Sequence, residues 1–177
     1  MTYGPFHLTA PKLAVMSDDR AHRYWLARIW DRTRPILVVC MFNPSTADAN
    51  RDDPTISRLC KWATRWGYGG ILVVNLYSLR TSDPTELQGR ERQAFGDAQP
   101  EAWAAALDIA ARQETPVLVA WGALGSAFAS GPFLDAAIDL DLICLGTTAD
   151  GRPKHPMARG KSRVPDDQEP LIWERPT

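Results

Sequence analysis

Four short apolar segments, separated by more polar stretches, dominate the hydrophobic pattern of the chain. They are rich in Val, Ile and Leu and span residues 36–42, 71–76, 116–121 and 140–145. Apolar runs of this length, too short for helices, are typical of strands buried on both faces. Apolar residues at helical spacing over 56–66 and an alanine-rich segment at 101–112 separate the runs. The pattern predicts an α/β fold: a central, mostly parallel four-stranded sheet between two layers of helices.

The regions outside this alternation are harder to interpret. Residues 1–35 are treated as an N-terminal extension, in which 22–30 alternates as an extra edge strand would, although a short helix explains it almost as well. Residues 81–98 are predicted to be a polar loop, long enough for a lid or binding loop. Residues 146–177 are predicted to be loop-rich and locally basic. No repeat or linker interrupts the chain, so we expect a single domain over 1–177.

Composition narrows the class of protein without naming an activity. The 177 residues are 45% apolar and 23% charged, which suits one globular domain with a substantial core. The net charge of −1 and the pI of about 6.3 exclude a global basic field but leave room for a local basic edge. Three cysteines without C-x-x-C spacing favour free thiols in a reducing compartment. With no signal pattern and no membrane-spanning run, we expect a cytoplasmic protein without a membrane partner.

Polar residues follow each predicted strand at its carboxyl end, where open α/β sheets bind their ligands. Asn43–Asp48 follows the first strand, Asn75 ends the second, Trp121–Gly122 ends the third, and a loop with His155 follows the fourth. An Asn amide can hold a water molecule or bind a base edge, and a histidine can stabilise an anion on a leaving group. Simpler interpretations remain: turn residues for both asparagines, and an exposed histidine without a function.

Metal, nucleophile and cofactor sites fit the sequence less well. The three histidines show no ligand spacing, so we predict neither a metal ion nor a cofactor. Asp52 and Asp53 precede Pro54 and suit the start of a helix better than a divalent-cation site. Ser45 lacks the G-x-S-x-G elbow of the α/β-hydrolases.

Several of these segments together resemble the DUF1643 family of uncharacterised bacterial and phage proteins. The resemblance covers roughly residues 20–160 and rests on Met-Phe-Asn-Pro-Ser-Thr-Ala-Asp, Asp-Asp-Pro-Thr, Arg-Trp-Gly-Tyr-Gly, Val-Asn-Leu, Ala-Trp-Gly, Cys-Leu-Gly and Lys-His-Pro. The family label itself implies no activity.

The order of the motifs also resembles, more distantly, that of the uracil-DNA glycosylase superfamily. In its mismatch-specific branch a Gly-Ile-Asn-Pro-Gly motif follows the first central strand, and residues 41–45 match its Asn-Pro but not its glycines. The late His-Pro-Ser loop of the superfamily is matched at His155, with Met157 in place of the serine. The resemblance implies that Asn43 positions the attacking water, Asn75 reads a flipped base, and His155 lies near the base carbonyl.

Three functional hypotheses follow. The first is a DNA glycosylase-like hydrolase that cleaves the N-glycosidic bond of a damaged or modified base, with DNA favoured over RNA as partner. The second is a non-catalytic module that recognises nucleic acids or nucleotides, and the third is a hydrolase or transferase of free nucleotides.

The candidate catalytic residues are Asn43 and His155. The candidate substrate-binding residues are Phe42 (by stacking), Pro44, Ser45, Asp53, Asn75, Trp121 and Gly122. The basic residues expected to contact phosphates are Arg152, Lys154, Arg159, Lys161 and Arg163.

Overall fold

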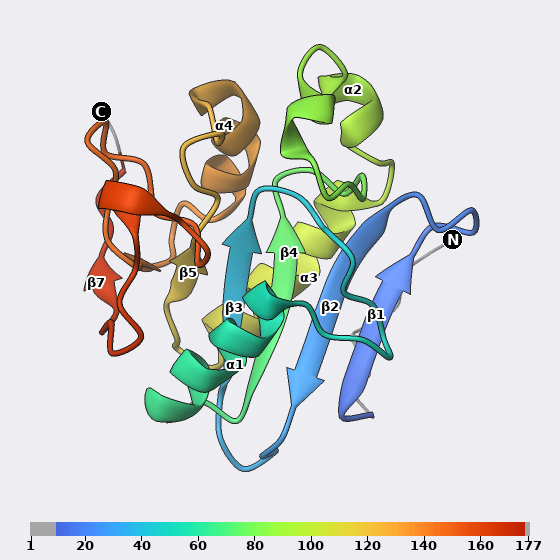
Figure 1. The fold of residues 1–177 in the computed structure, drawn as a ribbon. Coiled ribbons are helices and arrows are strands. Elements are labelled where there is room, and N and C mark those ends of the chain that lie inside the picture. The colour runs from blue at the N-terminus through green and yellow to red at the C-terminus, as the bar shows by residue number, and fades with distance from the viewer. Residues whose placement is uncertain (1–9, 176–177) are drawn as a thin grey trace.

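Seven strands in the order β1-β2-β4-β3-β5-β6-β7 form the sheet of this computed structural model, in which residues 10–175 are described (Figure 1). The four central strands run parallel: β4 (Gly70–Asn75), β3 (Ile36–Met41), β5 (Val117–Val119) and β6 (Leu142–Cys144). They coincide with the four apolar runs of the sequence. The predicted α/β class is therefore confirmed, whereas the predicted size of the sheet is wrong, because three antiparallel strands extend it.

Two of the added strands, both from the N-terminal part of the chain, extend the sheet beyond β4. β1 (Lys12–Met16) pairs with β2 (Arg23–Ile29), and β2 pairs with β4, both antiparallel. Every residue of β2 is buried, Arg23 and Arg28 included. The prediction of a strand within 22–30 is thus confirmed over a helix, but its placement at the edge is wrong. The edge is β1, which the hydrophobic pattern did not indicate.

The polar segments contain more regular structure than the sequence predicted. The expected loop 81–98 includes the 3₁₀-helix η1 (Pro84–Leu87) and the short helix α2 (Glu91–Ala94), which bury Leu87 and Ala94. The C-terminal segment contains a 3₁₀-helix, η2 (Gly160–Ser162), and the strand β7 (Leu171–Ile172), which pairs antiparallel with β6. These elements are too short to leave a periodic signal in the sequence.

Helices cover both faces of the sheet (Figure 1). On one face, α1 (Pro54–Arg65) packs Ile56 and Trp62 against alternate residues of β3 such as Leu37. On the other face, α3 (Gln99–Arg112) and α4 (Ala127–Ala136) pack on the intervening residues such as Val38. This burial on both faces explains why the central strands are continuously apolar rather than alternating.

Two further predictions concern the cysteines and membrane-spanning segments. Cys40 and Cys144 are buried, as expected of small core residues, and the three cysteines of the chain are free thiols. Within residues 10–175, none of the helices combines the length and the apolar character needed to cross a membrane.

Candidate functional site

A polar pocket of about 230 Å³ opens at the edge of the sheet where β3 and β4 end. Five segments of the chain contribute to it: the start of β2, the loop after β3, the start of α1, the loop after β4 and the C-terminal loop. Four residues predicted from the sequence line it together: Asn43, Ser45, Asp53 and His155. The further polar residues of its lining are Arg23, Thr55, Thr81 and Ser82. We call this the strand-end pocket.

The side chain of Asn43 is held by the main chain of two loops. Its Nδ2 donates hydrogen bonds to the carbonyl oxygens of Pro44 (3.0 Å) and Thr81 (2.9 Å). Both amide hydrogens are therefore used, and no donor among residues 10–175 is bonded to Oδ1. Asn43 can act towards a ligand or a water molecule only as a hydrogen-bond acceptor. Pro44, another predicted site residue, is buried and serves this arrangement through its carbonyl group.

His155 is oriented by the loop that carries it. Its Nδ1 accepts a hydrogen bond from the main-chain N–H of Met157 (3.1 Å), so the neutral ring carries its proton on Nε2. Burial lowers the pKa of His155 to about 4, and the nearby negative charge of Asp53 offsets only part of that effect. At neutral pH the ring is therefore an uncharged donor through Nε2–H.

Gly122 determines how closely the His155 loop approaches β5. Its φ angle is +77°, a conformation that favours glycine, and a Cβ atom there would lie 3.0 Å from the Cβ of His155. Its N–H donates to the carbonyl of Pro153 (2.9 Å). Gly122, a predicted substrate-binding residue, is not among the residues that line the strand-end pocket and packs against His155 instead.

Asp53 caps helix α1 and also lines the strand-end pocket. Its Oδ1 accepts a hydrogen bond from the N–H of Ile56 (2.9 Å), as the Asp-Asp-Pro pattern predicted. No donor in the described part of the chain is bonded to its Oδ2. One carboxylate oxygen thus remains available to a ligand, and Asp53 is the acidic residue that the described part of the chain contributes to the lining.

Arg23 is the site residue that the sequence reasoning missed. Only 1% of it is exposed, and its guanidinium donates to the carbonyl of Ala47 (2.9 Å) and to Oδ1 of Asn75 (3.3 Å). Within residues 10–175, its Nε has no hydrogen-bond partner and no carboxylate lies within ion-pair distance of the guanidinium. Burial lowers the pKa of Arg23 to about 10, so it still carries its charge at neutral pH. The available signal was a pair of arginines, Arg23 and Arg28, in a segment that is otherwise apolar.

Asn75 does not line the pocket, contrary to the prediction that it contacts substrate. It is completely buried, and its side chain reaches the pocket only through the hydrogen bond from Arg23. Its main-chain carbonyl accepts from Gln99 Nε2 (2.6 Å) and Trp103 Nε1 (2.8 Å). It therefore connects α3 to Arg23 and acts as a positioning residue.

Two predicted aromatic contacts also belong to the core. Trp121, only 3% exposed, packs edge-on against Trp173 with ring centroids 5.5 Å apart. Phe42 packs edge-on against Tyr77 at 5.4 Å, and Tyr77 in turn lines a separate apolar pocket of about 480 Å³ between α2 and α4. Neither Phe42 nor Trp121 lines the strand-end pocket, because alternate residues along a strand point to opposite faces of a sheet.

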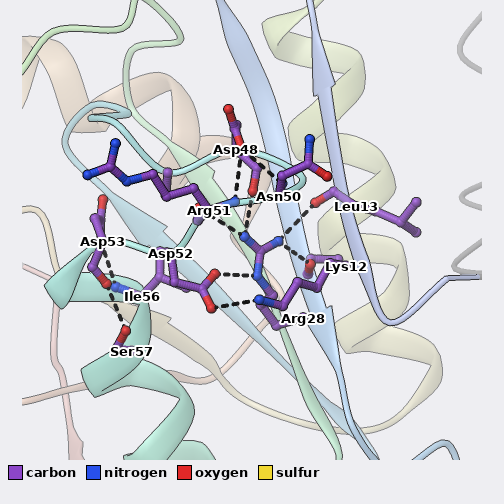
Figure 2. Close-up of polar contacts among 12 residues, drawn as sticks. Lys12, Leu13, Arg28, Asp48, Asn50, Arg51, Asp52, Asp53, Ile56 and Ser57 are labelled. Carbon is purple, nitrogen blue, oxygen red and sulfur yellow. Dashed lines mark hydrogen bonds and ion pairs between the residues drawn. The ribbon is translucent and has the colours of Figure 1, made fainter.

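The loop between β3 and α1 is held by a second buried arginine, Arg28 (Figure 2). Its Nε donates to Asp52 Oδ1 at 2.6 Å, and its Nη2 donates to the carbonyls of Asp48 (2.5 Å) and Arg51 (3.4 Å). Asp52 also binds Lys12 at 3.2 Å. Asp52 is thus occupied by cations and Asp53 by a helix cap, and residues 10–175 contain no cluster of metal-ligand side chains.

The five basic residues predicted to contact phosphates do not form one strip. Arg152 forms an ion pair with Asp150 (2.9 Å) and donates to the carbonyl of Ala123. Lys154 is half-buried beside Gly146. The three that are exposed lie around η2: Arg159, Lys161 and Arg163. These three are the most exposed of the five and are the best placed to contact a polyanion.

Comparison with known proteins identifies the family of this chain. A family model described as "Protein of unknown function (DUF1643)" matches residues 23–157, and the chain belongs to this family. Neither the curated proteins nor the solved structures that were searched include a match. The matched region contains every lining residue of the strand-end pocket.

Proposed function

We propose that this DUF1643 protein hydrolyses an N-glycosidic bond and that the base to be released occupies the strand-end pocket. The observation that carries the proposal is that Asn43, which can act only as an acceptor, and His155, a neutral donor, line the same pocket of about 230 Å³. Base release by water needs these two functions: one group that orients the water and one that stabilises the departing base.

The reaction can be written with these two residues. Oδ1 of Asn43 accepts a hydrogen bond from a water molecule and directs its oxygen at C1′ of the sugar. The C1′–N bond breaks and the bonding electrons leave with the base, while the water oxygen bonds to C1′. Nε2–H of His155 donates to the oxygen of the base on which negative charge develops. The proton lost from the water ends on the released base, so no further reactant is needed.

Two additional features support the proposal. The parallel centre of the sheet, with helices on both faces, agrees with what the resemblance to the uracil-DNA glycosylase superfamily implies. Asn43 follows the first parallel strand, and His155 lies in a late loop, in the order of that superfamily's motifs. The lining is also rich in hydroxyl groups, which suits a polar heterocycle better than an apolar ligand.

The test is release of free base from oligonucleotides, measured by mass spectrometry. The panel contains uracil, deaminated purines, guanine and modified bases in single and double strands. The Asn43→Ala variant should reduce release by about 100-fold or more, because the attacking water loses its acceptor. Asn43→Asp keeps an acceptor oxygen and should retain more activity than Asn43→Ala. Arg112→Ala, on the exposed end of α3, serves as the control and should match the wild type.

A second candidate, a hydrolase of free nucleosides or nucleotides, is favoured by the interrupted basic strip. Arg152 is paired with Asp150 and Lys154 is half-buried, which leaves a smaller basic surface for a polymer. The same panel therefore includes free nucleosides. Release from oligonucleotides with a steep salt dependence supports the glycosylase, because phosphate contacts release counterions. Release from free nucleosides alone supports the second candidate, and no release from either class contradicts the proposal.

A further inference from the structure

Arg23 lines the strand-end pocket, and part of its guanidinium is not used by the residues that the structure describes. A guanidinium carries five N–H groups, and within residues 10–175 the Arg23 guanidinium donates to two acceptors, the Ala47 carbonyl and Asn75 Oδ1. The remaining N–H groups include the buried and unpartnered Nε. A buried charged group without a matching acceptor is costly, so a ligand with acceptors would complete the site.

Asp53 presents the opposite chemistry in the same pocket. One carboxylate oxygen caps α1 through Ile56, and the other has no donor among the residues described. The pocket therefore contains unused donors on Arg23 and an unused anionic acceptor on Asp53.

The charges of the lining sum to zero at neutral pH. Arg23 is positive and Asp53 is negative, and these are the charged side chains of the lining, because His155 is neutral. A net anion such as phosphate would gain from Arg23 but would be repelled by Asp53. A neutral ligand with an acceptor edge and a donor edge suits both residues.

We propose that the pocket selects an oxopurine base, guanine or hypoxanthine, with Arg23 bound to its O6 and N7 acceptors and Asp53 to its N1–H. This inference rests on the proposed function and specifies its substrate class. Arginine paired with O6 and N7 is the commonest specific contact to guanine. Adenine replaces one of the two acceptors with an N6 amino donor, which would face the guanidinium unfavourably. Uracil has no second acceptor beside its O4 to match N7.

The experiment measures binding of guanosine, inosine, adenosine, uridine and inorganic phosphate to the full chain by titration calorimetry. We expect guanosine and inosine to bind at least 10-fold more tightly than adenosine or uridine. Arg23→Lys keeps the charge but loses the planar fork, and it should abolish this preference. Asp53→Asn keeps a good helix cap and should weaken guanosine more than inosine, because only guanine adds an N2 amino group to the donor edge.

A second variant covers the case in which Arg23→Lys does not fold. Asn75→Asp is nearly isosteric and places a carboxylate beside the guanidinium, where it would compete with the ligand for Arg23. It should reduce guanosine binding at least 10-fold while circular dichroism shows an intact fold. Loss of binding in Asn75→Asp and in Asp53→Asn would together support the inference.

Each contrary outcome has a distinct meaning. Uridine or adenosine binding as tightly as guanosine, with base release still dependent on Asn43, would overturn the oxopurine inference and leave the glycosidic hydrolase intact. Phosphate that displaces guanosine would show an anion site and also overturn the inference. Absence of nucleoside binding together with absence of base release would overturn the proposed function as well.

Discussion

Arg23 and Arg28 lie on the same strand, β2, and are almost equally buried, yet their surroundings differ. Arg28, 3% exposed, has the carboxylate of Asp52 and several main-chain carbonyls as partners (Figure 2). Arg23, 1% exposed, has two neutral acceptors, an unpartnered Nε and no ion pair with residues 10–175. Removal of a buried charge that is fully paired is costly because its partners are left buried and unpaired, whereas an incompletely paired buried charge in a pocket is a candidate for contact with a ligand.

The two arginines nevertheless act on one segment, the loop between β3 and α1. Arg23 binds the carbonyl of Ala47, and Arg28 binds those of Asp48 and Arg51. This loop follows Asn43 and ends at Asp53, so both ends of it contribute to the strand-end pocket. Both arginines thus hold the loop through its main-chain carbonyls; Arg23 also lines the pocket, whereas Arg28 does not.

The largest expected effect is a difference in how much the free energy of unfolding falls when each of the two arginines is replaced. Arg28→Met should lower the free energy of unfolding by about 3–5 kcal/mol, because it leaves Asp52 and several carbonyls without their buried partner. Arg23→Met should lower it by about 1–3 kcal/mol, because it removes an incompletely paired buried charge but leaves the Ala47 carbonyl and Asn75 Oδ1 without their donor. Urea denaturation of both variants measures the difference.

A double-mutant cycle checks the reason for that difference. If Asp52 is the main partner of Arg28, Asp52→Asn should cost far less in the Arg28→Met background than in the wild type. Equal losses in Arg23→Met and Arg28→Met would contradict the contrast between a ligand-facing and a structural arginine.

The second expected effect is a difference in pH dependence: the region around His155 and the region around Arg28 should lose stability at different pH values. The pKa of His155 is about 4 in the folded protein and 6.5 without perturbation, so the unfolded chain binds its proton first as the pH falls. Stability is fully present above pH 6.5 and should fall by on the order of 2 kcal/mol as the pH drops towards 4. His155→Gln should flatten this part of the pH profile.

The Arg28 region should respond only at lower pH. Partial burial raises the pKa of Asp52, but the hydrogen bonds and charges of Arg28 and Lys12 lower it by more. The pKa of Asp52 in the folded protein is therefore below 3.8. The stabilisation contributed by Asp52 is present above pH 3.8 and is lost as the pH falls through the lower pKa that Asp52 has in the folded protein. Thermal melts of Asp52→Asn should therefore differ in pH profile from the wild type below pH 4 only. A profile altered between pH 6.5 and 4 would contradict this assignment.

The smallest expected effect compares the neighbouring carboxylates, Asp52 and Asp53. Asp53→Ala removes the cap of α1 and should cost about 1 kcal/mol, whereas Asp53→Asn, with an equally good capping residue, should change stability by a few tenths. Urea denaturation distinguishes the two. A loss of 1 kcal/mol or more in Asp53→Asn would mean that its charge stabilises the fold, for example through Arg23, and would weaken its assignment as a ligand-facing group.

The residues found in the pocket show which kinds of site residue a sequence can reveal. Asn43, Ser45 and His155 could be predicted because parallel strands end at one edge of a sheet, so residues after different strands converge there. Asp53 could be predicted as a cap from local residue types alone. Arg23 could not, because β2 is antiparallel and begins where its parallel neighbours end, and that pairing is not encoded within the segment itself.

The mistaken assignments have a related cause. Trp121 and Asn75 stand at strand ends like Asn43, but one packs against Trp173 and the other lies beneath Arg23. Position at a strand end places a residue at the correct edge, whereas the direction of its side chain depends on the register and twist of the whole sheet.

The sequence by itself determined the α/β class, the four parallel central strands, the helix start at Asp53 and the convergence of Asn43 and His155. Those features follow from local propensity, hydrophobic period and the geometry common to parallel sheets. The tertiary structure alone decided that β2 is an interior strand and that Arg23 and Arg28 have different partners. Partners of a buried charge come from segments distant in the chain, so only the packed fold establishes which charge is fully paired and which is left for a ligand.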